Sequence, residues 1–180
     1  MSLHGSVDLL VVVSGIPGSG KTTLARRLAP ALGLPLLAKD TIKEALLDAL
    51  GSGDLAHSRR LGGASHEVLL AVAAESPQAV LESFFWPGVA EPRLIALGRP
   101  LVQVWCRCPL DLAIARYRDR TDDPDRHPGH RPEHQDARAT EHWMTAEPRP
   151  LDIDPLISVD TDRPVDIDAL IADIHEASRR

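Results

Sequence analysis

The sequence predicts an α/β fold, in which a five-stranded parallel sheet carries helices on both faces. Short apolar runs of strand length alternate with longer stretches whose apolar residues recur every three or four positions. Strands that alternate with helices are joined by right-handed crossovers, which produce a parallel sheet covered on both sides. No internal repeat or linker-like tract interrupts this alternation in the 180 residues. We therefore expect a single domain over residues 1–180.

Each element of this fold follows from a local pattern. Apolar runs bounded by polar or turn residues predict the strands at residues 9–13, 34–38, 78–84, 101–106 and 156–159. Apolar residues spaced for one helical face predict the helices at residues 22–32, 41–50, 56–75, 89–97, 110–120, 133–145 and 166–177. In a parallel sheet the ligand lies beyond the carboxyl ends of the strands, so the segments that leave those ends are the candidates for a functional site.

The composition is that of an ordinary globular domain, with 43% hydrophobic and 26% charged residues. No apolar run approaches 18 residues and no basic region precedes the first one, so we expect neither a membrane span nor a secretory signal, and a cytoplasmic protein. The 20 basic and 26 acidic residues give a net charge of −6, which argues against a duplex-binding surface but is compatible with a local basic cleft. Cys106 and Cys108 lack the second cysteine pair of a zinc site and are expected to be buried thiols.

The most informative stretch is GIPGSGKTT at residues 15–23, directly after the first predicted strand. It matches G-x-x-x-x-G-K-[ST], in which glycines let the backbone curl around a polyphosphate and open a helix whose N-terminus favours anions. Lys21 is expected to reach the β- and γ-phosphates, and the Thr22 hydroxyl to bind the Mg²⁺ that accompanies a nucleoside triphosphate. The expected nucleotide-binding residues of this loop are Gly15, Pro17, Gly18, Ser19, Gly20, Lys21, Thr22 and Thr23.

Two carboxylates follow predicted strands, and each has two open interpretations. Asp40, after the second strand, is placed to accept the proton of an attacking hydroxyl, as phosphoryl transfer requires. It is also suited to cap a helix that begins at Thr41, because Asp is a favoured N-cap. Glu82 ends the third strand and either holds Mg²⁺ or its water, or faces solvent. The aromatic residues at 84–86 either stack on a substrate ring or pack in the core.

A lid is expected at about residues 116–140, where Pro, Gly and charged residues are too frequent for a core element. Arg116 and Arg120 stand four apart and project from one face of the preceding helix, so they can close on the transferring phosphoryl group. An ordinary solvated helix face is the alternative. The histidines of this region lack the spacing of a metal site and are expected to contact substrate or solvent; they are His127, His130, His134 and His142.

The loop after the fifth predicted strand completes the candidate site. In this kind of sheet that loop lies beside the nucleotide base, so Arg163 is expected to contact it. Asp162 or Asp166 is expected to cap the last helix, a role that is compatible with nucleotide binding nearby.

The order of these motifs resembles that of the P-loop kinases grouped with the polynucleotide 5′-kinase domain, chloramphenicol phosphotransferase and zeta toxins. The segments that carry the resemblance are residues 15–23, 39–43, 113–120 and 159–161. It implies a three-layer P-loop NTPase fold similar to nucleoside monophosphate kinases with a lid, and ATP with Mg²⁺ as the donor. It also implies a general base at Asp40 and lid arginines at Arg116 and Arg120. The lid segment 127–130 matches no substrate signature of the group, so the resemblance implies no particular acceptor.

Taken together, these features predict a kinase that transfers the γ-phosphoryl group of ATP to a hydroxyl of a small molecule such as a nucleoside, a sugar or an antibiotic-like compound. One alternative is a polynucleotide 5′-hydroxyl kinase, which requires a basic groove that fits a strand. The other is a nucleotide-dependent regulatory ATPase without acceptor chemistry. The residues leave the acceptor and the oligomeric state open.

Overall fold

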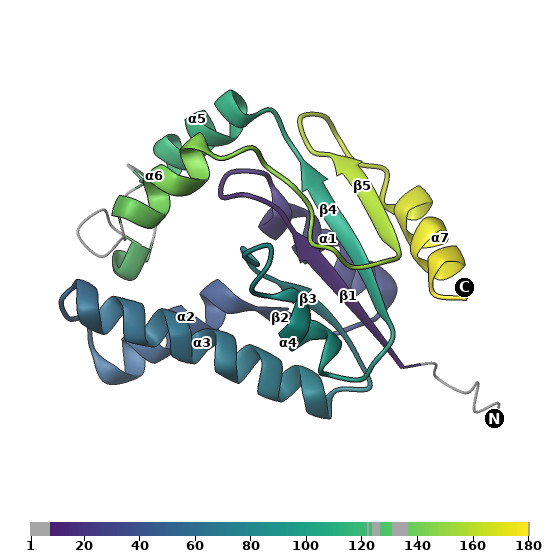
Figure 1. Ribbon diagram of the computed structural model, residues 1–180, viewed down its shortest axis with the longest axis horizontal. Helices are drawn as coiled ribbons and strands as arrows, with labels where there is room; N and C mark the ends of the chain where they lie inside the picture. The colour runs from purple at the N-terminus through teal and green to yellow at the C-terminus, as the bar shows by residue number, and fades with distance from the viewer. Residues whose placement is uncertain (1–7, 122, 124–126, 131–136, 180) are drawn as a thin grey trace.

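The five predicted strands form one parallel sheet. The computed structural model describes residues 8–121, 123, 127–130 and 137–179. The strands are β1 (Leu9–Ser14), β2 (Leu36–Ala38), β3 (Gln78–Glu82), β4 (Leu101–Arg107) and β5 (Leu156–Asp160). Their order in the sheet is β2-β3-β1-β4-β5, and every neighbouring pair is parallel (Figure 1). The predicted α/β class and strand number are therefore confirmed.

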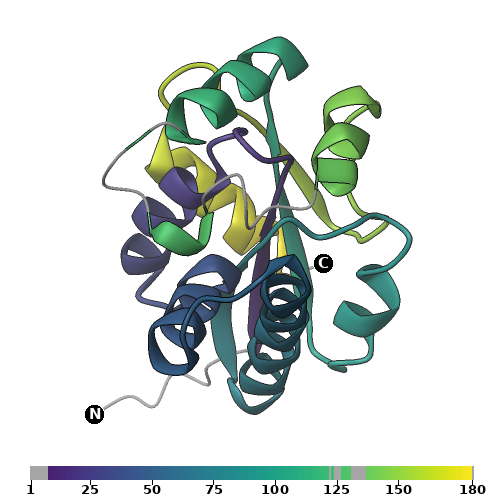
Figure 2. The same ribbon diagram turned by 90° about the vertical axis from the view of Figure 1, so that its left-hand side faces the viewer.

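The helices cover both faces of the sheet. They are α1 (Lys21–Leu32), α2 (Lys39–Leu50), α3 (Leu55–Glu75), α4 (Glu91–Ile95), α5 (Leu110–Thr121), α6 (Ala137–Thr145) and α7 (Ile167–Ala177), with a 3₁₀ turn η1 (Pro128–His130). Figure 2 shows α1 and α7 on one side of the sheet and α4 on the other. None of the helices in the described ranges is both long enough and apolar enough to cross a membrane.

Alternate residues of β1 face opposite layers of the molecule. Val11 and Val13 belong to a buried cluster with residues of α1 and α7, whereas Leu10 and Val12 belong to a second cluster with residues of α3 and α4. This is the two-residue period of a strand, and it explains why the central strand reads as one continuous apolar run. Each such fully buried side chain contributes about 1.5–3 kcal/mol, so the two clusters hold the helical layers on the sheet.

The boundaries of some elements differ from the prediction. The helix expected from Thr41 begins at Lys39, directly after β2, and the strand expected to end at Phe84 ends at Glu82. Part of the helix predicted at 133–145 lies outside the described residues, and α6 occupies its second half. Cys106 and Cys108 are buried and free, as predicted, and burial raises the pKa of the Cys106 thiol to about 12.

The strand order reverses around β1, and this reversal identifies the edge of the sheet at which a ligand is expected to bind. The chain leaves β1 towards β2 and β3, then crosses back to form β4 and β5 on the other side. Ligands of open parallel sheets bind at the carboxyl ends of the strands at such a reversal. In Figure 1 the strand arrows point to the end of the molecule where α2 and α3 lie on one side and α5 and α6 on the other. The segments that carry the predicted site residues all leave the sheet at this edge.

Candidate active site

The loop between β1 and α1 has the geometry of a phosphate-binding loop. Gly18 and Gly20 both have a φ of +83°, in the left-handed region that favours glycine. A Cβ on Gly18 would also overlap the carbonyl oxygen of Ala113 on α5, so this glycine lets the loop pass close to the helix. The curled loop leads straight into α1, whose first amide groups have no partner inside the helix.

Two side chains of this loop indicate an anionic ligand. The Ser19 hydroxyl is fully buried and has no hydrogen-bond partner among the described residues. Buried hydroxyls are normally bonded, so an orphaned one at a helix N-terminus indicates an absent acceptor. The Lys21 ammonium is also buried, and it folds back to donate to the Ile16 carbonyl at 3.5 Å. A polyphosphate supplies acceptors for both groups, and the loop therefore fits a nucleotide.

Thr22 and Glu82 meet beneath this loop. The Thr22 hydroxyl donates to the Glu82 carboxylate at 3.3 Å, and Glu82 is only 2% exposed. Burial raises the pKa of Glu82, against the opposing effect of the Lys21 charge and the Thr22 hydrogen bond. The interpretation of Glu82 as a solvent-facing side chain is therefore wrong. A hydroxyl beside a buried carboxylate fits Mg²⁺, which takes few protein ligands and keeps several waters.

Asp40 lies in the first turn of α2 and does not cap it. The helix begins at Lys39, its N-cap is Ala38, and no side chain caps it. The Lys39 ammonium instead donates to the Asp40 carboxylate at 3.1 Å, and 57% of the Asp40 side chain is exposed. The capping interpretation is therefore wrong, and Asp40 is accessible at the ligand edge.

The charges around Asp40 keep its carboxyl ionised. Although 57% of the side chain is exposed, the surrounding protein segments partly desolvate the carboxylate and raise its pKa. The positive charges of Lys39, His130 and Lys21, together with the Lys39 hydrogen bond, lower the pKa and outweigh that effect. The result is a pKa well below the ordinary value for Asp. Asp40 also influences the pKa of Glu82, so Lys21 and both carboxylates lie within electrostatic reach of one another. Asp40 is thus a hydrogen-bond acceptor of low basicity within electrostatic reach of Lys21.

The histidines of the lid contact acidic residues of α2. His127 pairs with Asp48 at 3.1 Å, and His130 pairs with Glu44 at 2.9 Å. Contact of these two histidines with substrate or solvent stays a prediction, and His134 lies outside the described residues. A group of three or more metal-ligating side chains is absent from the described part of the chain. The sequence signal for the lid contact is the spacing of Glu44 and Asp48, which stand four apart on one helical face.

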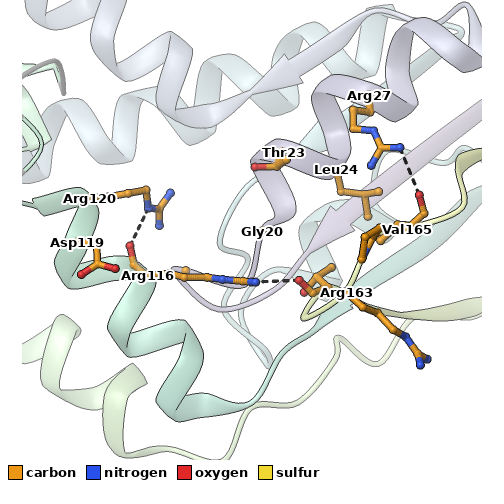
Figure 3. A pocket seen from close by; sticks show the side chains of 12 residues that line it. Gly20, Thr23, Leu24, Arg27, Arg116, Asp119, Arg120, Arg163 and Val165 are labelled. Atoms are coloured by element: carbon orange, nitrogen blue, oxygen red, sulfur yellow. Dashed lines mark hydrogen bonds between the residues drawn. The ribbon is translucent and has the colours of Figure 1, made fainter.

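The lid arginines line a cavity on the other side of the phosphate-binding loop (Figure 3). This cavity of about 460 Å³ is bounded by the loop, α1, α5 and the segment after β5, and its lining includes Gly18, Gly20, Arg116, Arg120, Arg163 and Val165. The Arg116 guanidinium donates to the Thr161 carbonyl at 3.1 Å, and Arg120 donates to the Arg116 carbonyl at 3.4 Å. Arg116 is therefore not on a merely solvated helix face, whereas Arg120 is exposed, and the role of both arginines at the transferring group stays a prediction. The described lining of this cavity does not include Asp40.

The segment after β5 is tied to the phosphate-binding loop. The Thr161 hydroxyl donates to the Ser19 carbonyl at 2.6 Å, a contact that the sequence pattern did not reveal. Arg163 lines the cavity but pairs with Asp160 at 3.1 Å, and Figure 3 shows its side chain extending away from Gly20. The Asp166 carboxylate caps α7 by accepting from the Ala169 amide at 3.1 Å, as predicted. The expected contact of Arg163 with a nucleotide base stays a prediction.

Comparison with known families agrees with this geometry. Residues 10–142 match the family described as AAA domain, a stretch that contains the phosphate-binding loop, Asp40, Glu82 and Arg116. The chain belongs to this family of P-loop kinases. The resemblance to P-loop kinases drawn from the motifs is therefore confirmed, and the protein is a phosphotransferase of the P-loop type. Use of a nucleoside triphosphate with Mg²⁺ is general to this fold.

Individual relatives extend the comparison. The chain is 37% identical over 90 residues to a cytidylate kinase from Pyrobaculum neutrophilum, a match that covers 47% of this chain and 48% of the relative. The match thus spans about half the length of that curated protein. A crystal structure of a candidate kinase from Chloroflexus aurantiacus has a TM-score of 0.83 at 30% identity and covers 96% of this chain and 98% of the other. A shikimate kinase from Acinetobacter baumannii, with a TM-score of 0.50 at 17% identity over 94% and 92% of the two chains, shares the fold alone.

Proposed function

We propose that the protein transfers the γ-phosphoryl group of ATP to a hydroxyl group of a small molecule. The observation that carries the proposal is the exposed Asp40 side chain at the carboxyl end of β2, within electrostatic reach of Lys21. Lys21 belongs to the loop that fits the phosphates, and Asp40 is accessible from the acceptor side. Phosphoryl transfer depends mainly on positioning and charge stabilisation. In this proposal Asp40 positions the acceptor hydroxyl, and Lys21 stabilises the charge of the phosphates.

On the donor side, the protein's own groups hold the triphosphate and its metal. The loop amides, the Ser19 hydroxyl and Lys21 bind the phosphates, and Thr22 with Glu82 holds Mg²⁺ directly or through water. The metal ion, when bound, neutralises charge on the phosphate oxygens. Arg116 and Arg120 approach from α5, and we assign them to stabilising the transferring group, with Arg163 at the nucleotide-base end.

On the acceptor side, Asp40 orients the attacking hydroxyl and takes its proton. The hydroxyl oxygen forms the new bond to the γ-phosphorus, the bond from that phosphorus to the β-phosphate oxygen breaks, and ADP leaves. A carboxylate of low basicity accepts the proton late, after most of the bond to ADP has broken. The main contribution of Asp40 is therefore orientation of the hydroxyl.

A second candidate acceptor is the phosphate group of a nucleoside monophosphate. It is favoured by the identity shared with a protein named cytidylate kinase. A phosphate acceptor has no proton that must be removed, and the charges of Asp40 and Glu82 repel it. The lysines on this side have partners of their own, since Lys39 bonds Asp40 and Lys43 donates to Ser58 at 3.0 Å. The local charge thus favours a neutral hydroxyl.

The test is a phosphorylation assay with paired acceptors. The purified protein is incubated with ATP and Mg²⁺ and with cytidine, cytidine monophosphate, ribose or a 5′-hydroxyl oligonucleotide. Products are identified by mass, and ³¹P NMR separates a new phosphomonoester from a pyrophosphate bond. Phosphomonoester formation on a small molecule is expected. Formation of the pyrophosphate bond alone supports the nucleotide kinase. Modification of the oligonucleotide alone, or ATP hydrolysis with every acceptor unmodified, supports one of the other two alternatives.

A further inference from the structure

All of the chain's Phe, Trp and Tyr residues lie in one region of the molecule. The sequence contains only two Phe, three Trp and one Tyr. They come from the segment after β3, from β4, from α5 and from α6, and they are Phe84, Phe85, Trp86, Trp105, Tyr117 and Trp143. Five of them line a single cavity of about 120 Å³ at the functional edge, and Tyr117 stacks edge-on against Trp143 with 5.0 Å between ring centres.

Core packing explains only part of this cluster. Phe85, Trp105 and Trp143 are buried, with exposures of 5%, 8% and 4%. Trp86 is only half-buried and lines two cavities, this one and a neighbouring one of about 180 Å³ that also contains His66. Its ring is 4.4 Å from that of Phe84 and 5.5 Å from that of His142, measured between centres. Protein cores are normally filled, so rings that surround open space indicate room for a ligand.

The cavity adjoins the phosphate-binding loop. Ile16 is one of the residues that line the cavity, and its carbonyl accepts a hydrogen bond from the Lys21 ammonium at 3.5 Å. Glu82, which bonds Thr22, is only two residues before Phe84. A molecule that occupies this cavity therefore lies against Ile16, the residue whose carbonyl accepts the Lys21 ammonium.

We propose that this aromatic cavity binds a flat ring of the acceptor, so that the preferred substrates are hydroxyl compounds carrying an aromatic or heteroaromatic ring. The inference rests on the proposed function and names the substrate class of that same site. A dry cavity of ~150 Å³ is known to hold one benzene ring, and the space here is of that order. Contacts between stacked or edge-on rings improve affinity by about two- to tenfold beyond the burial of surface.

The first test measures binding without turnover. The probes are 2-phenylethanol and cytidine, with 2-cyclohexylethanol as the saturated control. All three tryptophans line the cavity, so their fluorescence emission reports on its occupancy, and saturation-transfer NMR gives an independent readout. We expect at least one aromatic probe to bind saturably and about two- to tenfold more tightly than the cyclohexyl compound. Equal affinity for flat and saturated rings, or the absence of saturable binding by both aromatic probes, overturns the proposal.

Two substitutions of Trp86 then separate ring recognition from general packing. Trp86→Leu removes the ring but keeps apolar bulk, and Trp86→Phe keeps a ring. The leucine variant should lose the preference for aromatic probes, and the phenylalanine variant should keep most of it, with circular dichroism melts confirming that both are folded. Trp105 and Trp143 still report on occupancy in both variants. If Trp86→Leu keeps the preference for aromatic probes unchanged, the assignment of Trp86 to ring recognition is contradicted.

Turnover distinguishes this inference from the proposed function itself. If aromatic and saturated alcohols are phosphorylated with equal kcat/KM, the proposed hydroxyl kinase function is supported and the proposed ring-binding site is contradicted. If every alcohol stays unphosphorylated while the aromatic probes still bind preferentially, the ring site stands and the hydroxyl kinase fails. Faster phosphorylation of 2-phenylethanol than of 2-cyclohexylethanol, lost in Trp86→Leu, supports both.

Discussion

The donor and acceptor halves of the site are built in different ways. The donor half begins with nine consecutive residues, 15–23, whose glycines, lysine and threonines act through the loop backbone and the start of α1. The acceptor half combines Asp40 of α2 with the aromatic cavity, which is lined by residues that follow β3, by Trp105 of β4 and by residues of α6, segments that are far apart along the chain. A locally built half can be shared by many proteins, whereas a half assembled from separate elements is free to differ. Use of a nucleoside triphosphate with Mg²⁺ is general to this fold, and we expect the acceptor half to decide which substrate is used.

The two halves also differ in charge. The donor half contributes Lys21, Arg116 and Arg120, which suit the negative charge of a triphosphate. The acceptor half presents the Asp40 carboxylate and a cavity with five aromatic residues, whose charged lining residues, Glu147 and Arg149, are of opposite sign, and we expect it to suit a compound with a hydroxyl and a ring. This contrast defines which kinetic constant each substitution should change.

The largest loss is expected when the lysine between the two halves is removed. Lys21→Met keeps the length of the side chain but deletes the charge assigned to the γ-phosphate. We expect kcat to fall about 10²–10³-fold, the usual effect of losing one preorganised group that stabilises transition-state charge. The control is Arg26→Met, which deletes an exposed charge one turn along the same helix and should leave kcat within twofold. A kcat within tenfold of the wild type in Lys21→Met contradicts the assignment.

Asp40→Asn should affect the acceptor half alone. We expect kcat to fall about 10²-fold, at the lower end of the usual range for a general base, because the low pKa of Asp40 makes orientation its main role. The affinity for ATP, measured by calorimetry, should stay within twofold. For the same reason, Asp40 stays ionised as the pH falls from 7 to 5 and should produce no decline in kcat over that interval. Glu75→Gln removes an exposed carboxylate at the end of α3, serves as the control and should leave kcat within twofold.

The sequence predicted the geometry of the phosphate-binding loop well because its signal is local. Glycines at 15, 18 and 20 followed by Lys21 have one physical use at the end of a buried strand, and the observed φ values agree with it. For Asp40 the pattern left two roles open, because the choice depended on whether α2 begins at Lys39 or two residues later. That boundary is decided by how directly the chain turns after β2, which residue periodicity does not report.

Contacts between segments that are distant along the chain could not be predicted from the sequence. The pairing of His127 with Asp48, and of His130 with Glu44, joins residues that are 79 and 86 positions apart. The hydrogen bond from Thr161 to Ser19 spans 142 positions. A sequence shows that such side chains are able to bond, but only the folded topology selects the partners. For the aromatic residues at 84–86 the sequence left ring stacking open, but it did not reveal the cavity, because Trp105 and Trp143 come from separate elements.

Arg116→Ala should affect the donor half alone. This side chain lines the cavity that we assign to the nucleotide and donates to the Thr161 carbonyl, so its loss removes one charged hydrogen-bonding group. We expect kcat/KM for ATP to fall about tenfold, in line with the free energy of one charge-assisted hydrogen bond. KM for the acceptor should stay within twofold, and Arg118→Ala, on the exposed side of the same helix, should change neither constant. A selective rise in acceptor KM instead would place Arg116 in the acceptor half.

The smallest effect is expected for His66, which links the acceptor half to acid stability. Burial lowers the pKa of this side chain to about 4, aided by the positive charges of Lys39 and Arg93, and its ring nitrogen lies 3.4 Å from the Ser83 hydroxyl. The unfolded chain binds a proton near pH 6.5, whereas the folded protein resists protonation until about pH 4. The contribution of His66 to stability is therefore present above pH 6.5 and is lost as the pH falls towards 4.

His66→Gln removes this titration while keeping a side chain able to form a hydrogen bond. We expect its melting temperature, measured by circular dichroism, to fall less between pH 7 and pH 4.5 than that of the wild type. His175→Gln, at an exposed position on α7, should follow the wild-type curve. Because the donor half does not use His66, the rise in melting temperature on adding ATP with Mg²⁺ at pH 7 should be unchanged. If the variant loses stability with acid as steeply as the wild type, the acid sensitivity comes from groups other than His66, and the acceptor half does not differ from the donor half in this respect.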